Sequence, residues 1–345
     1  MRMVDREYCL PAEWAPQVAV LLAWPRLAAL EPVFVQIAVE VARREDVVIT
    51  CRDAAVAGHV RGLLAAAGVD LARVRLFEVA SDDPWARDHG PWTVIRRGCP
   101  LLLDFRFDGW GGRFAAELDD QGSRRLHVLG AFGAEAMASV DLVLAGGSVE
   151  SDGEGTLLTT RRCLLGPARS GLSQAELERQ LGVLLGAERL LWLTHGRLTG
   201  DDTCGHVAAL VRFTDGGTIV YQSCDDPADP DFVELQAMAA ELAGLRTAAG
   251  APYRLVPLPW PRARRGGDGA TLPASYANFL ILNGAVLVPT YDDPVDVAAL
   301  AGLRRCFPGR EVVGIDARAL LGQGGSLHRL AMPLPEPLTL GPGRV

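Results

Sequence analysis

The stretch Gly217-Thr-Ile-Val-Tyr-Gln-Ser-Cys-Asp-Asp-Pro-Ala-Asp229 has a counterpart of the same pattern in Gly284-Ala-Val-Leu-Val-Pro-Thr-Tyr-Asp-Asp-Pro-Val-Asp296. In both, a glycine precedes a short apolar run, and Asp-Asp-Pro-x-Asp follows it. Related apolar runs begin at residues 47, 101 and 156, so successive starts along the chain lie 54, 55, 62 and 67 residues apart. Self-similarity at a period of this size indicates a structural repeat.

In the clearest repeats the first run leads to a segment with apolar residues at helical spacing, and then to a second strand. Helices are expected over residues 54–67, 174–185, 231–245 and 295–307, with another beginning near Ser275 that carries Asn278 and Asn283. Second strands are expected over residues 74–79, 142–145, 190–193, 255–258 and 312–315. The sequence therefore predicts a single α/β domain, residues 1–345, with approximate ββαβ repeats at 47–100, 101–155, 156–217, 218–284 and 285–335.

The composition indicates a globular protein with a large core, since 49% of the 345 residues are hydrophobic. The net charge of −8 argues against a nucleic-acid partner, because phosphate binding needs a concentrated basic surface. No apolar run approaches the roughly 20 residues of a membrane helix, and the N-terminus lacks a signal-peptide pattern, so we expect a soluble cytoplasmic protein without membrane partners. The 7 cysteines include no Cys-x-x-Cys pair, which predicts neither a disulfide framework nor a zinc site.

The stretch Asp82-Asp-Pro-Trp-Ala-Arg-Asp-His-Gly-Pro-Trp92 follows the first of these second strands. Trp85 offers an aromatic face, and Asp88 offers a carboxylate three residues later. Together they suit a planar cation, through cation–π attraction and a hydrogen-bonded ion pair. The alternative is a buried Trp85 beside a surface pair between Arg87 and Asp88.

A second polar stretch, Gly200-Asp-Asp-Thr-Cys-Gly-His206, lies in a glycine-punctuated turn at the expected end of a strand. Acid, thiol and imidazole side chains are the groups that nucleophilic and acid–base catalysis use. The alternative is a polar turn with a capping Asp or Thr and a solvated histidine.

Further short motifs occur in order along the chain and give these two stretches a context. They are Glu13-Trp-Ala-Pro16, Ala23-Trp-Pro25, Asp104-Phe-Arg-Phe-Asp-Gly-Trp-Gly-Gly112, Gly146-Gly-Ser148, Asp152-Gly-Glu-Gly-Thr-Leu-Leu-Thr-Thr160, Cys163-Leu-Leu165 and Tyr276-Ala-Asn-Phe279. With the motifs around Asp88 and His206, the series closely resembles the agmatine deiminase and bacterial-type peptidylarginine deiminase family, from about Pro11 to Pro335. The resemblance implies that family's five-bladed α/β propeller, the pentein fold, which agrees with the five repeats.

The resemblance also implies a thiol mechanism for a guanidinium substrate. In that family two carboxylates hold the guanidinium, a cysteine near the C-terminus attacks its central carbon, and a histidine assists ammonia departure and activates water. Asp88 matches the first carboxylate and His206 matches the histidine. His89 and His328 flank acids or glycines, but no motif has a metal-ligand spacing such as His-x-x-x-His and the family needs no metal, so no metal or cofactor is expected.

Two positions depart from the family pattern. The second carboxylate of the family lies two residues after the histidine, where this chain has Ala208. The nucleophile of the family follows a Gly-rich turn and a histidine, and here the residue after His328 is Arg329. A guanidinium that stays protonated cannot replace a thiolate as the nucleophile. Cys204 is the only other thiol in a motif with an acid and an imidazole, and as a displaced nucleophile it would be activated by His206.

Three hypotheses follow, each with a small-molecule ligand. The first is an enzyme of the deiminase fold that acts on a small polar guanidino or amidine-type compound, carboxylate-bearing in one version, by non-thiol chemistry using Asp88 and His206. The second is a catalytically inactive ligand-binding protein. The third is a guanidine deiminase with Cys204 as the nucleophile. A homodimer is compatible with the sequence.

The predicted site residues form two groups. The catalytic candidates are His206, Asp88 and Cys204. The candidates for substrate binding are Trp85, Arg87, Trp110, Gly147, Asp201, Asp202, His328 and Arg329. Arg329 is expected to clamp a ligand carboxylate bidentately while any cationic end of the ligand reaches Asp88. The alternative is that Arg329 pairs with a neighbouring acid such as Asp201 or Asp202.

Overall fold

The computed structural model describes residues 8–166, 171–203, 205–262, 264–266 and 269–343. The chain forms two compact units. Unit 1 comprises the residues up to Gly146 together with those from His328 onward, and unit 2 comprises Gly147 to Leu327. The single domain over residues 1–345 stays a prediction. Of the helices in the described ranges, none has both the length and the apolar character that crossing a bilayer requires.

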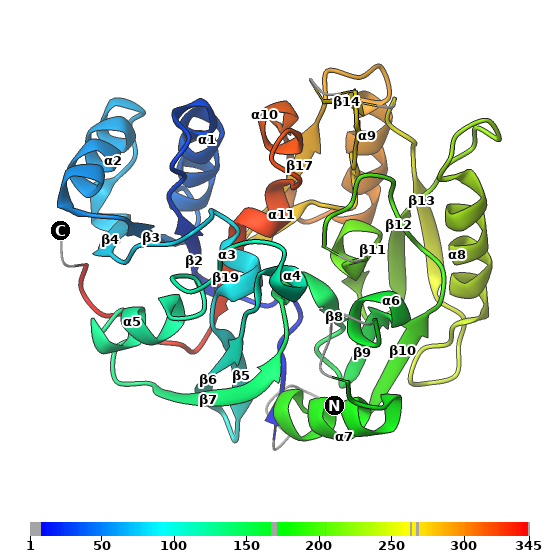
Figure 1. Ribbon diagram of the computed structural model, residues 1–345, viewed down its shortest axis with the longest axis horizontal. Helices are drawn as coiled ribbons and strands as arrows, with labels where there is room; N and C mark the ends of the chain where they lie inside the picture. Colours follow the sequence, from blue (N-terminus) through cyan, green and yellow to red (C-terminus); the bar gives the residue numbers. More distant parts are fainter. Residues whose placement is uncertain (1–7, 167–170, 204, 263, 267–268, 344–345) are drawn as a thin grey trace. The chain divides into compact units, whose positions relative to one another are not determined.

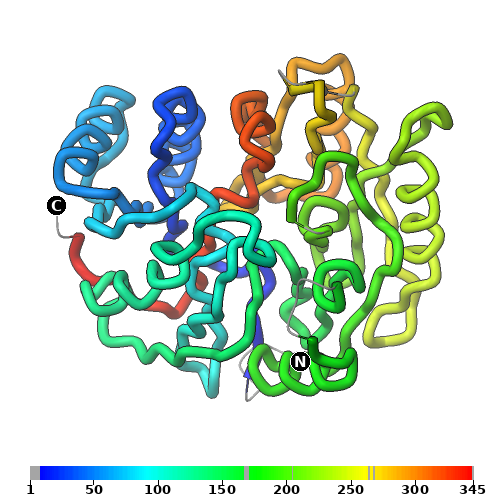
Figure 2. Tube along the Cα trace, in the orientation of Figure 1, coloured from blue at the N-terminus to red at the C-terminus, as the bar shows by residue number. Residues whose placement is uncertain are grey.

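The first sheet of unit 1 joins the two ends of the chain. Its strands, in spatial order, are β19 (Ala331–Pro335), β2 (Gln17–Ala23), β3 (Asp46–Cys51) and β4 (Val74–Glu78). The C-terminal strand β19 is antiparallel to β2, whereas β2, β3 and β4 are parallel to one another. The parallel crossovers are the helices α1 (Glu31–Ala42) and α2 (Ala54–Ala66), which lie side by side (Figures 1 and 2).

The second sheet of unit 1 combines an N-terminal strand with three strands that follow β4 along the chain. Its strands, in spatial order, are β1 (Tyr8–Cys9), β5 (Trp92–Arg96), β6 (Cys99–Arg106) and β7 (Ala136–Val143). The pairs β1·β5 and β5·β6 are antiparallel, and β7 returns parallel to β6 after helix α5 (Gly122–Val128). An antiparallel pair followed by a helix and a parallel strand is the ββαβ order that the repeats predict.

Unit 2 repeats this order in three sheets of its described residues. The strands are β8 (Val149–Ser151), β9 (Thr156–Thr160) and β10 (Arg189–Leu193); β11 (Val211–Asp215), β12 (Thr218–Gln222) and β13 (Arg254–Leu258); β16 (Leu280–Leu282), β17 (Ala285–Thr290) and β18 (Glu311–Asp316). In each sheet the first pair is antiparallel and the second is parallel. The crossover helices are α7 (Gln174–Leu185), α8 (Phe232–Gly244) and α9 (Asp296–Cys306). A small hairpin pairs β14 (Arg264–Arg265) with β15 (Thr271–Leu272).

Sequence chemistry explains where these elements begin and end. In α7 the hydroxyl of Ser173 accepts a hydrogen bond from the Glu176 backbone N–H, which caps the first turn, and Gly186 ends the helix at a left-handed φ of 69°. The buried residues of α7 are three leucines at four-residue spacing, which form one face of the helix. The central strands are almost fully buried, because helices and neighbouring elements cover both faces of a parallel pair.

The strands and crossover helices predicted from the repeats are confirmed, except that the strand expected over residues 142–145 begins earlier and ends at Val143, as β7. The strand beginning at residue 47 is β3, and those beginning at residues 101, 156, 218 and 285 are β6, β9, β12 and β17. The helix expected near Ser275 is wrong. Asn278 lies in a turn, and Asn283 lies in the turn between β16 and β17. The hydroxyl of Ser275 donates to the Ala209 carbonyl, so this segment is fixed by side-chain bonds to other loops and not by a helix.

Short helical turns after the strands carry the polar motifs. These turns are α3 (Ala86–His89) after β4, α4 (Gly109–Gly112) after β6, η5 (Val207–Ala209) after β10, and α11 (Leu327–Leu330) before β19. The remaining short helices are η2 (Ala28–Leu30), η3 (Leu71–Arg73), η4 (Gly146–Ser148), α6 (Arg161–Leu164) and α10 (Arg318–Leu321). Turns at strand ends leave side chains free to converge away from the sheet, which is where functional groups collect.

Candidate functional site

Asp88 on α3 is the centre of a buried cluster in unit 1. Its side chain is 0% exposed, and its Oδ2 accepts hydrogen bonds from the Nε of Arg329 at 2.9 Å and from the indole Nε1 of Trp110 at 3.1 Å. A carboxylate so buried needs such charge-assisted partners, because an uncompensated charge in this position costs several kcal/mol. Asp88 is therefore committed to a guanidinium, and that guanidinium belongs to Arg329.

Arg329 also contacts two aromatic rings. Its guanidinium carbon lies 4.7 Å from the ring centroid of Trp85 and 4.3 Å from that of Trp110. Both distances lie within the range of cation–π attraction, and the Arg329 side chain is only 6% exposed. Trp85, Asp88 and Trp110 thus form a binding site for a planar cation, which we call the guanidinium box. The side chain of Arg329 lies in it.

The backbone at Trp110 is held in an unfavourable conformation to complete this box. Trp110 has φ 58° and ψ 51°, and its neighbours Gly109 and Gly111 also have positive φ. The left-handed region costs a bulky residue about 1–2 kcal/mol, and such strain persists where the surroundings enforce it. Asp108 supports the turn by accepting from the Gly111 N–H, and a Cβ on Gly109 would lie 2.2 Å from the carbonyl of Phe114. The glycines of this motif therefore place the indole.

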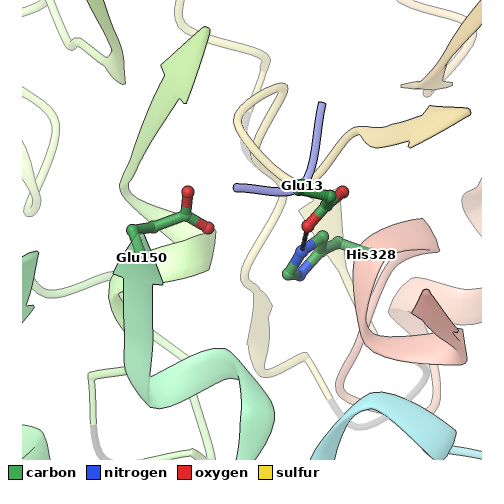
Figure 3. Close-up of side chains that lie close together, drawn as sticks. All are labelled: Glu13, Glu150 and His328. Atoms are coloured by element: carbon green, nitrogen blue, oxygen red, sulfur yellow. Dashed lines mark hydrogen bonds and ion pairs between the residues drawn. The ribbon is translucent and has the colours of Figure 1, made fainter. Parts of the chain in front are cut away.

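Glu13 fixes the two residues that adjoin Asp88 and Arg329 in sequence. Its Oε2 accepts from Arg87 Nη2 at 2.8 Å. The same oxygen accepts from the imidazole Nε2 of His328 at 2.7 Å (Figure 3). Glu150, also labelled in Figure 3, belongs to unit 2, where it pairs with the buried Arg212. Arg87 and His328 are both buried, so Glu13 compensates two cationic or polar groups next to the box.

In unit 2 the motif around His206 is held together by Asp201. The carboxylate of Asp201 accepts from the backbone N–H of Thr203 at 3.0 Å, from the Thr203 hydroxyl at 2.6 Å and from the N–H of Gly205 at 2.7 Å. The Thr203 oxygen accepts in turn from the His206 N–H at 3.1 Å. The carboxylate of Asp201 thus binds groups of its own loop, and these bonds fix the backbone conformation at His206.

His206 is itself closely packed, with 3% of its surface exposed. A Cβ built on Gly147 would lie 2.4 Å from the imidazole Nδ1, so only glycine fits at this position. Asp202 lies similarly close to Gly324, where an added Cβ would be 2.5 Å from a carboxylate oxygen. Ala208 is buried beside this loop. Gly147, which was predicted to bind substrate, and Gly324 thus make room for the side chains of the motif.

The predicted site residues therefore divide between the two units. Unit 1 brings together Trp85, Asp88, Trp110 and Arg329, and places Arg87 and His328 on Glu13; unit 2 holds Gly147, Asp201, Asp202 and His206. The acid that pairs with Arg329 is Asp88, which sequence reasoning had assigned to a ligand. Cys204 lies outside the described residues. Glu13 was missed as a site residue, although an acid beside a tryptophan and a proline in an otherwise apolar stretch was a usable signal.

Comparison with known proteins identifies the family of the chain. The model of the Porphyromonas-type peptidyl-arginine deiminase family matches residues 9–335. The chain belongs to this family. It is 35% identical to an agmatine deiminase from Pseudomonas aeruginosa (strain LESB58) over 360 residues, which is 95% of both chains.

Solved structures of the family confirm the fold class. A crystal structure of a candidate arginine deiminase from Porphyromonas gingivalis superimposes with a TM-score of 0.92 at 46% identity, covering 96% of this chain and 99% of that one. A cysteine-to-serine variant of the C. jejuni agmatine deiminase with substrate bound superimposes with a TM-score of 0.88 at 29% identity, covering 96% and 97%. The predicted α/β deiminase fold of ββαβ repeats is therefore correct.

Proposed function

We propose that this chain is a ligand-binding member of the deiminase family that does not hydrolyse guanidines, and that Arg329 is the resident occupant of its guanidinium box. The observation that carries the proposal is the pairing of Arg329 with Asp88 at 2.9 Å, under the rings of Trp85 and Trp110. This combination of carboxylate and aromatic faces is the chemistry that would recognise the guanidinium of agmatine or arginine. A substrate guanidinium and Arg329 compete for the same groups.

The competition strongly favours Arg329. Entry of an outside guanidinium requires the buried ion pair of Asp88 and Arg329 to separate, which leaves the Arg329 charge to be accommodated elsewhere. Breaking a buried pair costs about 3–5 kcal/mol. This cost corresponds to a loss of affinity of about a hundredfold to a few thousandfold. With Asp88 neutralised by Arg329, the box also offers no net attraction to a cation, so the ligand is a small polar molecule without a guanidinium.

The chemistry of residues 208 and 329 supports the absence of hydrolysis. In the family resemblance Arg329 stands where the cysteine nucleophile is expected, and a guanidinium that stays protonated forms no covalent intermediate. Ala208 stands where a second carboxylate is expected, so a substrate guanidinium would have one acid fewer to hold it. Either change alone weakens a thiol mechanism, and together they remove its binding and its covalent step.

A second candidate function is an enzyme with different chemistry, which uses His206 as an acid–base group. The specific observation in its favour is the intact support of His206 by the Asp201 loop and by the space at Gly147. In this version the substrate is a small polar, carboxylate-bearing compound. Cys204 as a displaced nucleophile is the third version.

Two measurements separate these functions. A colorimetric ureido assay with agmatine and arginine is expected to give no product above the uncatalysed level, and robust product would refute the main proposal. If such product disappeared in Cys204→Ala, the displaced-thiol version would replace it. Calorimetry with agmatine is expected to show no binding to the wild type, binding to Arg329→Ala, and none to the double variant Arg329→Ala/Asp88→Asn. Turnover of a non-guanidine compound that is lost in His206→Ala would favour the second candidate.

A further inference from the structure

We propose that Asp83, His89 and Asp119 in unit 1 form a binding site for one divalent transition-metal ion, with Zn²⁺ as its representative. The ligand atoms of these three residues lie within 4.8 Å of one another. The His89 Nε2 is 4.0 Å from an oxygen of Asp83 and 3.8 Å from an oxygen of Asp119. One imidazole nitrogen and two carboxylate oxygens are a ligand set typical of zinc and its neighbours, and the nitrogen disfavours Mg²⁺ and Ca²⁺.

Burial makes this cluster different from an ordinary acidic surface patch. The His89 side chain is 8% exposed and that of Asp119 is 0% exposed. Among the residues that the structure describes, no hydrogen-bond partner is within reach of the His89 Nε2 or the Asp119 Oδ2. Buried polar atoms are nearly always partnered in native proteins, so the unpartnered His89 Nε2 and Asp119 Oδ2 in one cluster indicate that a further group binds there.

The backbone holds the three side chains in place independently of any ion. Asp119 accepts from the Asp82 N–H at 2.8 Å, and the Asp82 carboxylate accepts from the Leu118 N–H at 2.9 Å, so two loops are tied reciprocally. Asp83 accepts from the Trp85 N–H at 2.8 Å. Each of these carboxylate oxygens keeps a second lone pair for a metal. The site is therefore preorganised, as a metal site must be.

The ring of His89 is also fixed. It packs against Phe107 with centroids 5.9 Å apart, and a Cβ on Gly122 would lie 3.8 Å from its Nδ1, in ordinary contact. A cavity of about 10 Å³ borders His89, Asp119 and Gly122. That volume holds about one water molecule, which is the further ligand that a three-residue zinc site usually takes.

The separations are close to those of a zinc site. A zinc ion bonds such atoms at about 2.1 Å, and pairs of ligand atoms 3.8 and 4.0 Å apart then subtend about 130–145° at the ion. Ligand atoms of a regular tetrahedral zinc site lie about 3.4 Å apart, so this cluster is about half an ångström wider, a difference that small side-chain rotations close.

Helix α3 links this cluster to the guanidinium box. The ion would also anchor α3 at both ends, since Asp83 receives the Trp85 N–H and His89 follows Asp88. The site thereby positions two members of the guanidinium box.

The test uses the full-length protein, stripped with a chelator and titrated with Zn²⁺ by calorimetry. We expect one ion per chain, with binding at least about a hundredfold weaker in both His89→Gln and Asp119→Asn. Asparagine at 119 keeps an oxygen to accept the Asp82 N–H, so the local backbone is preserved. His59→Gln is the matched control, because His59 also lies beside a carboxylate, at 3.0 Å from Glu31, but its side chain is 53% exposed. This control variant is expected to bind like the wild type.

A second probe covers the case in which a variant fails to fold. Co²⁺ bound to the wild type is expected to give visible d–d absorption without a thiolate charge-transfer band, which excludes the cysteines as ligands. The more exposed ligand is tested by Asp83→Asn, and Mg²⁺ serves as a probe that should not bind. The proposal is overturned if the folded wild type takes up no Zn²⁺, if a thiolate band appears, or if His89→Gln and Asp119→Asn bind as tightly as the wild type.

Discussion

Replacing Arg329 by alanine perturbs the guanidinium box directly. The change removes the ion pair to Asp88 and the contacts with Trp85 and Trp110, and it leaves a carboxylate that is 0% exposed with the indole Nε1–H of Trp110 at 3.1 Å as a remaining donor. Removing one partner of a buried pair costs about 3–5 kcal/mol. We therefore expect Arg329→Ala to lose about 4 kcal/mol of unfolding free energy.

This loss converts into a measurable change in melting temperature. With an unfolding entropy of about 2.1 cal/mol/K per residue, a loss of about 4 kcal/mol lowers the Tm by about 5 °C if all 345 residues unfold together. If unit 1 unfolds by itself, it involves roughly half of the chain, and the shift is about twice as large. Differential scanning calorimetry distinguishes the two cases by the number of transitions.

Added ligand should reverse the loss. Agmatine or guanidinium at about a hundred times its Kd stabilises the variant by about 2.7 kcal/mol, which returns about 4 °C, and it should leave the wild type unchanged. Arg318→Ala is the matched control, because its pair with Asp316 is about half exposed on both sides and should cost less than about 1 kcal/mol. A variant at 329 that is as stable as the wild type, or that does not respond to agmatine, would refute the resident-guanidinium explanation.

Two further predictions concern unit 2. Gly147→Ala should destabilise the protein by about 1–3 kcal/mol, because the new Cβ would lie 2.4 Å from the imidazole of His206. The control is Gly58→Ala, which should be neutral or stabilising, because Gly58 lies in a helix and its added Cβ would have no neighbouring atom within 4 Å. Urea unfolding of both variants measures the difference. Burial raises the pKa of Glu241, but hydrogen bonds from His195 outweigh this effect and lower the pKa overall. The contribution of Glu241 to the unfolding free energy is thus fully present above the pKa that this group has in the unfolded chain, and it is lost as the pH falls through the lowered pKa of the folded state. Glu241→Gln should therefore cost about 1 kcal/mol of unfolding free energy at pH 7 and nothing at acidic pH, in unfolding curves measured across pH.

The repeated elements could be predicted because their signals are local. Apolar runs such as that of β12 and amphipathic segments such as α7 carry their periodicity within ten to fifteen residues. The strand β2 was not predicted, although Gln17–Ala23 is almost fully buried. Its antiparallel partner β19 comes from the other end of the chain, and pairing between such distant segments leaves no local pattern.

The segment around Asn283 shows a second limit. Its apolar residues allow a helix, but Gly284 with φ 77° makes a tight turn between two strands, and the strand pairing overrides the local preference. At the site, the motif order identified Asp88 and Trp85 as a place for a planar cation. Sequence could not identify the cation, because Arg329 is separated from Asp88 by 241 positions and only the closure of β19 onto β2 brings them together.

The sequence predicts that Arg329 binds a ligand carboxylate, since an arginine in place of a thiol and an alanine in place of an acid make a site more positive. The structure contradicts this prediction, because Arg329 pairs with Asp88. At an effective dielectric constant near 20, a unit charge 4 Å from its opposite gains about 4 kcal/mol, so a buried Asp88 takes up the nearest guanidinium before any ligand arrives. The pair is then neutral, because the positive charge of Arg329, which was expected to bind an anionic ligand, is compensated by Asp88 inside the protein. The effect of a substitution such as the arginine at position 329 therefore depends on the groups that line the binding site, here the carboxylate of Asp88, and not only on the change in net charge.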